Sequence, residues 1–138
     1  MTINEIEGIM IMVSDQQRAL DFYTQKLGFT KKVDTDVAKF RWIVVGPKDS
    51  DTVISLVDPA SMKEWSKDSV DNAEKKIGTQ TGIWFFTKNI DEAYNELKSK
   101  GVEITKPEKQ VWGGIMSTVY DQDENSFGLV GDSDKNEN

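Results

Sequence analysis

The stretch "GIMIMVSDQQRALDFYTQKLGF" (residues 8–29) has a counterpart in "GIWFFTKNIDEAYNELKSKGVEI" (82–104) of the same 138-residue chain. Each stretch begins with Gly-Ile, passes through a short apolar run of strand length, reaches a polar residue and becomes amphipathic up to a glycine. A strand, a helix and a left-handed glycine stop account for this order. The chain therefore contains an internal repeat, and this repeat decides the fold.

In the first copy we predict a strand at 9–13. Ser14, followed by Gln17 three residues later, has the spacing of a capping box, so a helix is expected to begin there. Apolar residues recur at helical spacing until Gly28 ends the helix.

The second copy repeats this order of elements, with a strand at 83–87, a helix cap at Asn89 and a glycine stop at Gly101. After each stop, three further strand-like runs follow, at 29–37, 39–46 and 52–58 in the first copy and at 102–111, 115–121 and 126–131 in the second. Pro107 indicates that one of these is an edge strand or is interrupted.

The order strand-helix-strand-strand-strand, read twice, predicts an α+β fold. We expect two βαβββ modules that form a curved eight-stranded mixed sheet with helices on its outer face. The expected organisation is one domain, 1–138, with module 1 at about 5–58, a linker at 59–80, module 2 at about 81–131 and a tail at 132–138. In the linker we expect a helical turn at 59–66 and a mobile polar loop after it.

Composition excludes several kinds of chemistry. The net charge of −7 disfavours nucleic acid, which needs basic patches, and suits a cationic or neutral small molecule; solubility alone is the favoured explanation of the charge. The chain has no Cys and no His, so it has no disulfide, no thiolate or imidazole ligand and no cysteine nucleophile. We expect no signal peptide, no membrane span and a cytoplasmic location, because no basic and apolar leader and no long apolar run is present.

Strand side chains alternate between two faces, and the two faces differ here. One face of the first strand in each copy is mostly bulky and apolar, as a face packed on a helix should be. The opposite face mixes small, methionine and aromatic residues: Gly8, Met10, Met12, Gly82, Trp84 and Phe86, with Ser55 and Gly128 from the last strands. This mixture suits a cavity wall. A second core, closed by the other module or by a dimer partner, explains the same pattern.

Three stretches resemble one known family: "VSDQQRALDFYTQKLGF" (13–29), "NIDEAYNELKSKGVEI" (89–104) and "VWGGIMSTVYDQDENSFGLV" (111–130). They are similar to the strand-to-helix signature, the second helix and the closing strands of the vicinal oxygen chelate superfamily. That superfamily includes glyoxalase I, bleomycin-resistance proteins and extradiol dioxygenases. The resemblance implies the paired-module fold and a homodimer in which both chains build each cleft.

Metal-dependent members of that superfamily hold a divalent ion with four side chains, and the resemblance places these positions at Gly8, Ser55, Gly82 and Gly128. Three of them have no side chain and the fourth has only a hydroxyl, which does not supply the donors that such an ion needs. We therefore expect no metal and no cofactor. The glycines are interpreted as the open floor of a pocket, with a bulge or close backbone approach as the alternative.

Neighbouring residues Arg41 and Trp42 point to opposite faces, and the sequence does not decide which one lines the pocket. Arg41 would anchor an anionic group, whereas Trp42 would join Trp84, Phe86 and Trp112 in an aromatic wall. Tyr120 is the one candidate for an acid or base hydroxyl.

The function that follows is metal-free binding of a small, partly aromatic or cationic molecule. The ligand contacts are expected from Met10, Met12, Arg41, Trp42, Ser55, Trp84, Phe86 and Trp112. The alternative is an enzyme of the same superfamily with an atypical or metal-independent site. A third interpretation is a homodimer in which the open sheet face of one chain closes on that of the other.

Overall fold

The computed structural model describes residues 2–64 and 66–132 of the chain. Trp65 and residues 133–138 of the expected tail lie outside the described residues. The chain forms two compact units, unit 1 (Met1–Ile77) and unit 2 (Gly78–Asn138). No helix in the described residues is both long enough and apolar enough to cross a membrane.

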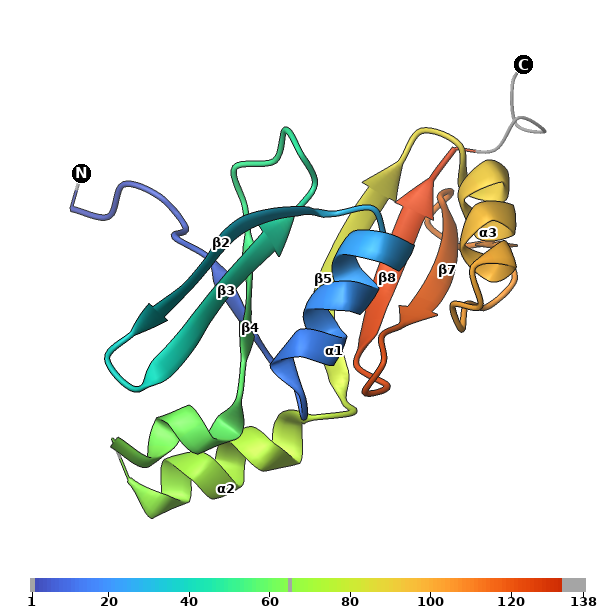
Figure 1. Ribbon diagram of the computed structural model, residues 1–138. Coiled ribbons are helices and arrows are strands. Elements are labelled where there is room, and N and C mark those ends of the chain that lie inside the picture. The colour runs from blue at the N-terminus through green and yellow to red at the C-terminus, as the bar shows by residue number, and fades with distance from the viewer. Residues whose placement is uncertain (1, 65, 133–138) are drawn as a thin grey trace. The chain divides into compact units, whose positions relative to one another are not determined.

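Unit 1 is a four-stranded mixed sheet with helices on one face and at one end (Figure 1). The strand order is β1-β4-β3-β2, with β1 parallel to β4 and the other neighbours antiparallel. The elements are β1 (Ile9–Met12), α1 (Gln16–Asp21), the π-helical turn η1 (Phe22–Lys26), β2 (Thr30–Val37), β3 (Phe40–Gly46), β4 (Ile54–Val57), the 3-10 helix η2 (Pro59–Glu64) and α2 (Lys67–Lys76).

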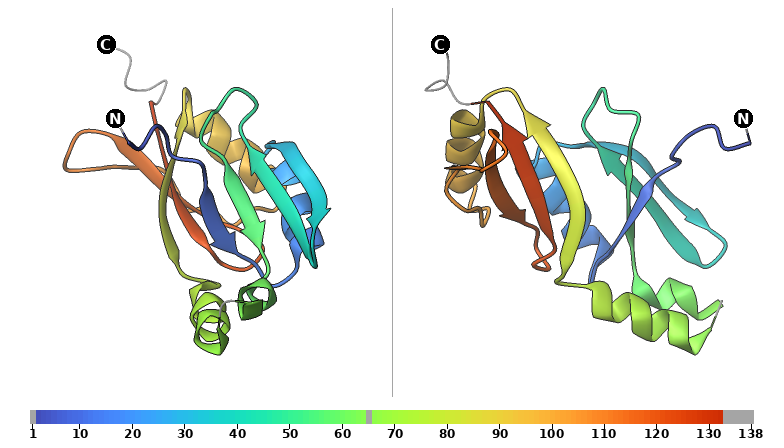
Figure 2. Two further views of the ribbon diagram at one scale, coloured as in Figure 1. Left: turned by 90° about the vertical axis from the view of Figure 1, so that its left-hand side faces the viewer. Right: turned by 180° about the vertical axis from the view of Figure 1, so that it is seen from behind.

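Unit 2 repeats this topology with the strand order β5-β8-β7-β6. Its elements are β5 (Gln80–Thr87), α3 (Ile90–Ser99), β6 (Glu108–Lys109), β7 (Ile115–Tyr120) and β8 (Ser126–Gly131). The helix α3 packs beside β7 and β8, as the views in Figure 2 show. The predicted α+β class with two βαβββ modules is confirmed, and the strands of the described residues form two four-stranded mixed sheets, one in each unit.

Each sheet buries one face, as the strand alternation predicts. In unit 1 the buried residues Ile43, Val45 and Leu56 lie on the face against which α1 packs, with Ala19 and Tyr23 from the helical segment. In unit 2 the corresponding face carries Val119, Phe127 and Leu129, and the Phe127 ring stacks on Phe85 with the centroids 4.9 Å apart. These faces are the cores of the two units.

The helix α1 begins one residue later than predicted. Its N-cap is Asp15, whose carboxylate accepts a hydrogen bond from the Arg18 backbone N–H at 3.0 Å, whereas Ser14 is exposed. Asp15 has the extended backbone that an N-cap requires and an oxygen that reaches the third helical residue. The glycine stops are confirmed, because Gly28 and Gly101 have φ values of 76° and 80°.

Residues 67–76, for which we predicted a mobile loop, form the helix α2. Ser66 caps it by accepting from the Ser69 backbone N–H, and Ala73 lies in a cluster with Met12 and Met62. The spacing of Val70, Ala73 and Ile77 was the signal for this helix. The prediction was wrong because the polar residues of α2 masked this narrow apolar stripe.

The predicted strand at 102–111 is interrupted, as Pro107 indicates. It is reduced to an isolated bridge between Ile104 and Val119 and the two residues of β6, which follow the proline.

The position of the α1 cap is tested by comparing Asp15→Ala with Asp15→Asn. We expect Asp15→Ala to lower the free energy of unfolding by about 1 kcal/mol, because a backbone N–H loses its acceptor, and Asp15→Asn to change it by less than about 0.5 kcal/mol, because the amide oxygen still accepts. Urea denaturation followed by circular dichroism measures both. Equal losses in the two variants would contradict the cap at Asp15.

Candidate functional site

Trp42, and not Arg41, lies on the face of the unit 1 sheet that carries Met10. In the strand register Met10 pairs with Ser55, and Ser55 pairs with Val44. Paired residues share a face, and Trp42 lies two residues before Val44, so Trp42 shares the face of Met10 and Ser55. This arrangement decides between the two orientations that the sequence left open.

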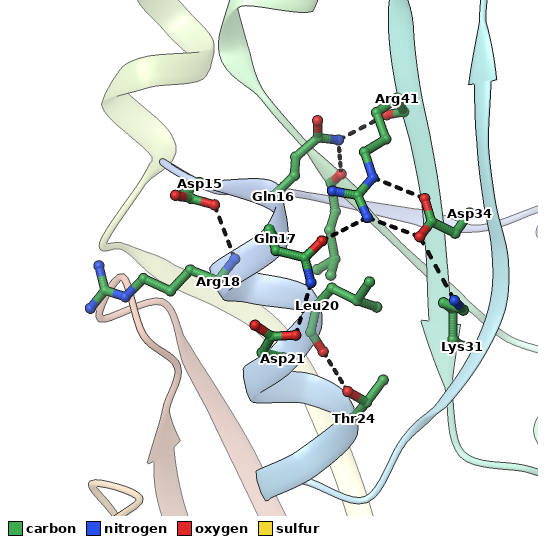
Figure 3. A network of polar contacts seen from close by, with 11 residues as sticks. Asp15, Gln16, Gln17, Arg18, Leu20, Asp21, Thr24, Lys31, Asp34 and Arg41 are labelled. Atoms are coloured by element: carbon green, nitrogen blue, oxygen red, sulfur yellow. Dashed lines mark hydrogen bonds and ion pairs between the residues drawn. The ribbon is translucent and has the colours of Figure 1, made fainter.

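The Arg41 side chain lies on the opposite face, where α1 packs (Figure 3). Its guanidinium donates two hydrogen bonds to the Asp34 carboxylate, both at 2.9 Å, and one to the Gln17 side-chain oxygen at 2.9 Å. The hydrogen bond from Arg41 lowers the pKa of Asp34 below its usual value, with a further contribution from the charges of Arg41 and Lys31. Arg41 is therefore committed to this network.

A cleft of about 560 Å³ opens in unit 1 where β3 begins and β4 ends, with η2 along one side. Its apolar lining includes Met10, Phe40, Trp42, Val57 and Met62, and its polar lining includes Gln16, Lys39, Arg41, Asp58, Lys63 and Glu64. Met10 and Trp42 remain 57% and 46% exposed, although both are large and apolar. Exposed apolar side chains in a concave surface are typical of a ligand site.

The other two predicted residues of unit 1 lie elsewhere. Met12 is buried in the cluster with Met62 and Ala73, beneath η2 and α2, and it does not line the cleft. Ser55 lies on the Met10 face but is not part of the cleft lining.

Unit 2 carries a second apolar surface on the equivalent face of its sheet. Trp84 and Phe86 are 63% and 68% exposed, and the Trp84 indole stacks on Trp112 with the centroids 6.1 Å apart and the planes at 21°. The register Trp84–Gly128–Thr118 places Tyr120 on this face as well. Four predicted residues, Trp84, Phe86, Trp112 and Tyr120, thus belong to unit 2.

The three glycines at equivalent positions have different surroundings. Gly82 has a φ of 74°, a conformation that favours glycine, and the β5–β8 register shifts between Gln80 and Trp84. A Cβ on Gly128 would lie 2.7 Å from the end of Met116 and 3.3 Å from the Trp84 indole. Side chains thus occupy the space over Gly128 where we expected open volume. A Cβ on Gly8 would meet only Val53, at 3.4 Å or more.

The side chains at the positions that the resemblance assigns to a metal do not fit a divalent ion. Gly8, Gly82 and Gly128 provide no donor, and Ser55 provides one hydroxyl oxygen, whereas such ions take four or more protein or water ligands. Among residues 2–64 and 66–132, no three Asp or Glu side chains are grouped so that they could hold a metal.

Sequence reasoning missed Gln16, Phe40 and Met62, which line the cleft. Phe40 has the same strand parity as Trp42, so alternation alone would have identified it once the Trp42 face was known. The sequence pattern places Gln16 in a helix and Met62 in the linker, and neither residue carries a local signal for the cleft.

The fold and the sequence together define a family. The family model for the Glyoxalase/Bleomycin resistance protein/Dioxygenase superfamily matches residues 3–129, and the chain belongs to this superfamily. The resemblance drawn from the sequence is thereby confirmed.

Particular relatives add detail. Protein YurT of Bacillus subtilis is 40% identical over 118 residues, which are 80% of this chain and 85% of YurT. A superfamily member from Sphaerobacter thermophilus has 37% identity and a TM-score of 0.83, over 96% of this chain and 100% of its own. TnmS3, an antibiotic binding protein from a Streptomyces species, has 30% identity and a TM-score of 0.78, over 96% of this chain and 99% of its own.

The glycine surroundings predict different responses to alanine. Gly82→Ala should lower the free energy of unfolding by about 1–2 kcal/mol, because alanine is strained at positive φ. Gly8→Ala should be neutral or stabilising by up to about 1 kcal/mol, since it restricts the unfolded chain without a clash. Thermal and urea denaturation measure both, and equal effects at the two positions would refute this backbone explanation.

The Asp34–Arg41 pair predicts a pH dependence. The pKa of Asp34 should rise toward its usual value in Arg41→Gln, and by less in Lys31→Gln, because Lys31 lies 3.8 Å away without the paired hydrogen bonds. A lowered folded-state pKa stabilises the protein above the usual carboxyl pKa, and this stabilisation disappears as pH falls through the lowered value. The stability difference between wild type and Arg41→Gln should therefore shrink in acid. Carboxyl NMR titration and urea denaturation across pH measure the two effects, and an unchanged Asp34 pKa in Arg41→Gln would count against the prediction.

Proposed function

We propose that this protein binds a small molecule with a planar aromatic part in the unit 1 cleft, without a metal. The observation that carries the proposal is the pair of exposed apolar side chains, Met10 and Trp42, at the wall of a cleft of about 560 Å³. This volume lies within the usual range for small-molecule sites, about 300–1,000 Å³. Trp42 offers a flat surface for stacking, and methionines adapt to irregular shapes.

The charges at the cleft favour no single ligand charge. Lys39 and Lys63 are matched by Asp58 and Glu64, and all four residues are exposed. Arg41 also lines the cleft, and its charge is paired with Asp34. Affinity should therefore come chiefly from apolar contact. The net charge of −7 acts at longer range, where it favours the approach of neutral or cationic molecules over anions.

The apolar surface of unit 2 is proposed as a separate binding surface for the same kind of ligand. Its stacked Trp84 and Trp112 and the exposed Phe86 have the composition that aromatic ligands require. The similarity to TnmS3, described as an antibiotic binding protein, supports binding as the function. The homodimer and the cytoplasmic location stay expectations within this proposal.

The alternative is an enzyme of the same superfamily. This chain is 26% identical over 132 residues to the lactoylglutathione lyase of Escherichia coli, which supports that alternative. Elemental analysis and a thermal melt with and without chelator address the metal-dependent form of this alternative. A stoichiometric divalent ion whose removal lowers the melting temperature would overturn the metal-free proposal.

The binding proposal is tested with a panel of quinoline, acridine and anthraquinone compounds, neutral and cationic, by isothermal titration calorimetry. Trp42→Ala should weaken binding by about 1–2 kcal/mol, that is about five- to thirtyfold, and Trp42→Phe should retain most of the affinity. Both variants should stay folded, because Trp42 is 46% exposed.

Trp84→Ala is the matched variant for the unit 2 surface. A loss confined to Trp84→Ala, with Trp42→Ala unchanged, would move the site out of the unit 1 cleft. Binding by no member of the panel would refute the proposed function.

A further inference from the structure

We infer that Gln16 makes the cleft selective for ligands that present a hydrogen-bond donor, an N–H or O–H group, beside their planar ring. This inference rests on the proposed function and names the class of ligand that the same cleft selects.

The Gln16 side-chain amide is held by two hydrogen bonds to the sheet. Its Nε2 donates to the Arg41 backbone oxygen at 2.8 Å and to the Leu56 backbone oxygen at 2.9 Å. A primary amide has two N–H protons, so both are used. Rotating the amide by half a turn would place its oxygen against two carbonyl oxygens, and this repulsion fixes the orientation.

The position of Gln16 follows from the way β3 and β4 separate. Their ladder pairs Val44 with Ser55 and Val45 with Ile54, and Arg41 and Leu56 lie beyond it. The carbonyls at Arg41 and Leu56 need another donor, because an unpaired backbone carbonyl in a half-buried place is costly. The Gln16 amide bridges the two strands where they separate, which is also where the cleft opens.

The Gln16 oxygen remains available for a ligand. Gln16 is half-buried and lines the cleft, and no donor within the described part of the chain is hydrogen-bonded to its Oε1. Figure 3 shows the amide oxygen turned away from the side on which the nitrogen makes its two hydrogen bonds. The oxygen is therefore a fixed acceptor, with its direction set before any ligand binds.

The charged groups of the cleft do not offer an acceptor whose direction is fixed before a ligand binds. Lys39, Lys63 and Glu64 are exposed, so their long side chains lose more conformational entropy when a ligand orders them. Asp58 is exposed as well, and its Oδ1 already accepts a hydrogen bond from the Ala60 backbone N–H at 3.0 Å. The Arg41 guanidinium is held by Asp34 and Gln17. A ligand without a donor would remove water from the Gln16 oxygen without forming a hydrogen bond to it, which should weaken binding about three- to tenfold.

Two pairs of probes with matched shapes test this selectivity. Indole and benzofuran differ by an N–H donor, and 2-naphthol and 2-fluoronaphthalene differ by an O–H donor. We would measure dissociation constants for all four compounds by ¹⁵N–¹H NMR titration of the wild-type protein and of two variants, Gln16→Lys and Trp42→Ala. Gln16→Lys keeps donors for the two carbonyls but removes the acceptor.

We expect the donor probe of each pair to bind the wild type about three- to tenfold more tightly. This preference should vanish or reverse in Gln16→Lys, whereas Trp42→Ala should weaken both members of a pair and leave their ratio unchanged. The wild-type comparison stands without any variant, so it remains decisive if Gln16→Lys fails to fold.

Each contrary result has its own meaning. Equal binding of both members of each pair in the cleft of the wild type would overturn the inference and leave the proposed function intact. A donor preference that survives in folded Gln16→Lys would also overturn it. Absence of binding by all four probes would refute both the inference and binding of small aromatic molecules in the cleft.

Discussion

The parallel pairing of the first and last strand is the constraint on which each unit depends. Met10 pairs with Ser55 in unit 1, and Trp84 pairs with Gly128 in unit 2, at equivalent points of the repeat. A parallel pair needs a crossover connection, which here includes a helix and two further strands, so one face of each sheet is covered and the other is left open. A shift of one residue would exchange the two faces and bury Trp84 where Phe85 now packs.

The polar network on the covered face supports the open face. Gln16 and Gln17 are neighbours on α1, and both are hydrogen-bonded to Arg41 near the beginning of β3. Gln17 accepts from the Arg41 guanidinium, and Gln16 donates to the Arg41 carbonyl. The beginning of β3, which carries Trp42, is thus anchored to α1 through the backbone and the side chain of Arg41, the residue before Trp42. A wall anchored in this way loses little conformational entropy when a ligand binds.

The sequence allowed the fold to be predicted well, because glycine stops, caps and strand alternation are local signals. Gly28, Gly101 and Asn89 carry them, and the structure has each in the expected role. The cap at α1 was misplaced by one residue because Ser14 and Asp15 are both good caps, and only the backbone conformation decides between them.

The candidate site was less predictable, because it depends on contacts between distant segments. Alternation showed that Arg41 and Trp42 face opposite ways, but only the register with Ser55 and Met10 orients them. The burial of Met12 depends on α2, whose partners cannot be read from local pattern. The repeat places the glycines at equivalent positions, but different features of the structure account for them. Gly82 has a positive φ that favours glycine, whereas Gly128 lies beneath the Trp84 indole ring.

The 3-10 helix η2 (Pro59–Glu64) belongs to neither copy of the repeat, yet it forms one side of the cleft. Met62 of η2 faces the cleft and also joins Met12 and Ala73 in the cluster beneath it. Insertions, deletions or substitutions in this segment can therefore alter the dimensions of the recess while both β-scaffolds persist. Such changes offer a route to new ligand preferences that leaves the paired βαβββ modules unchanged.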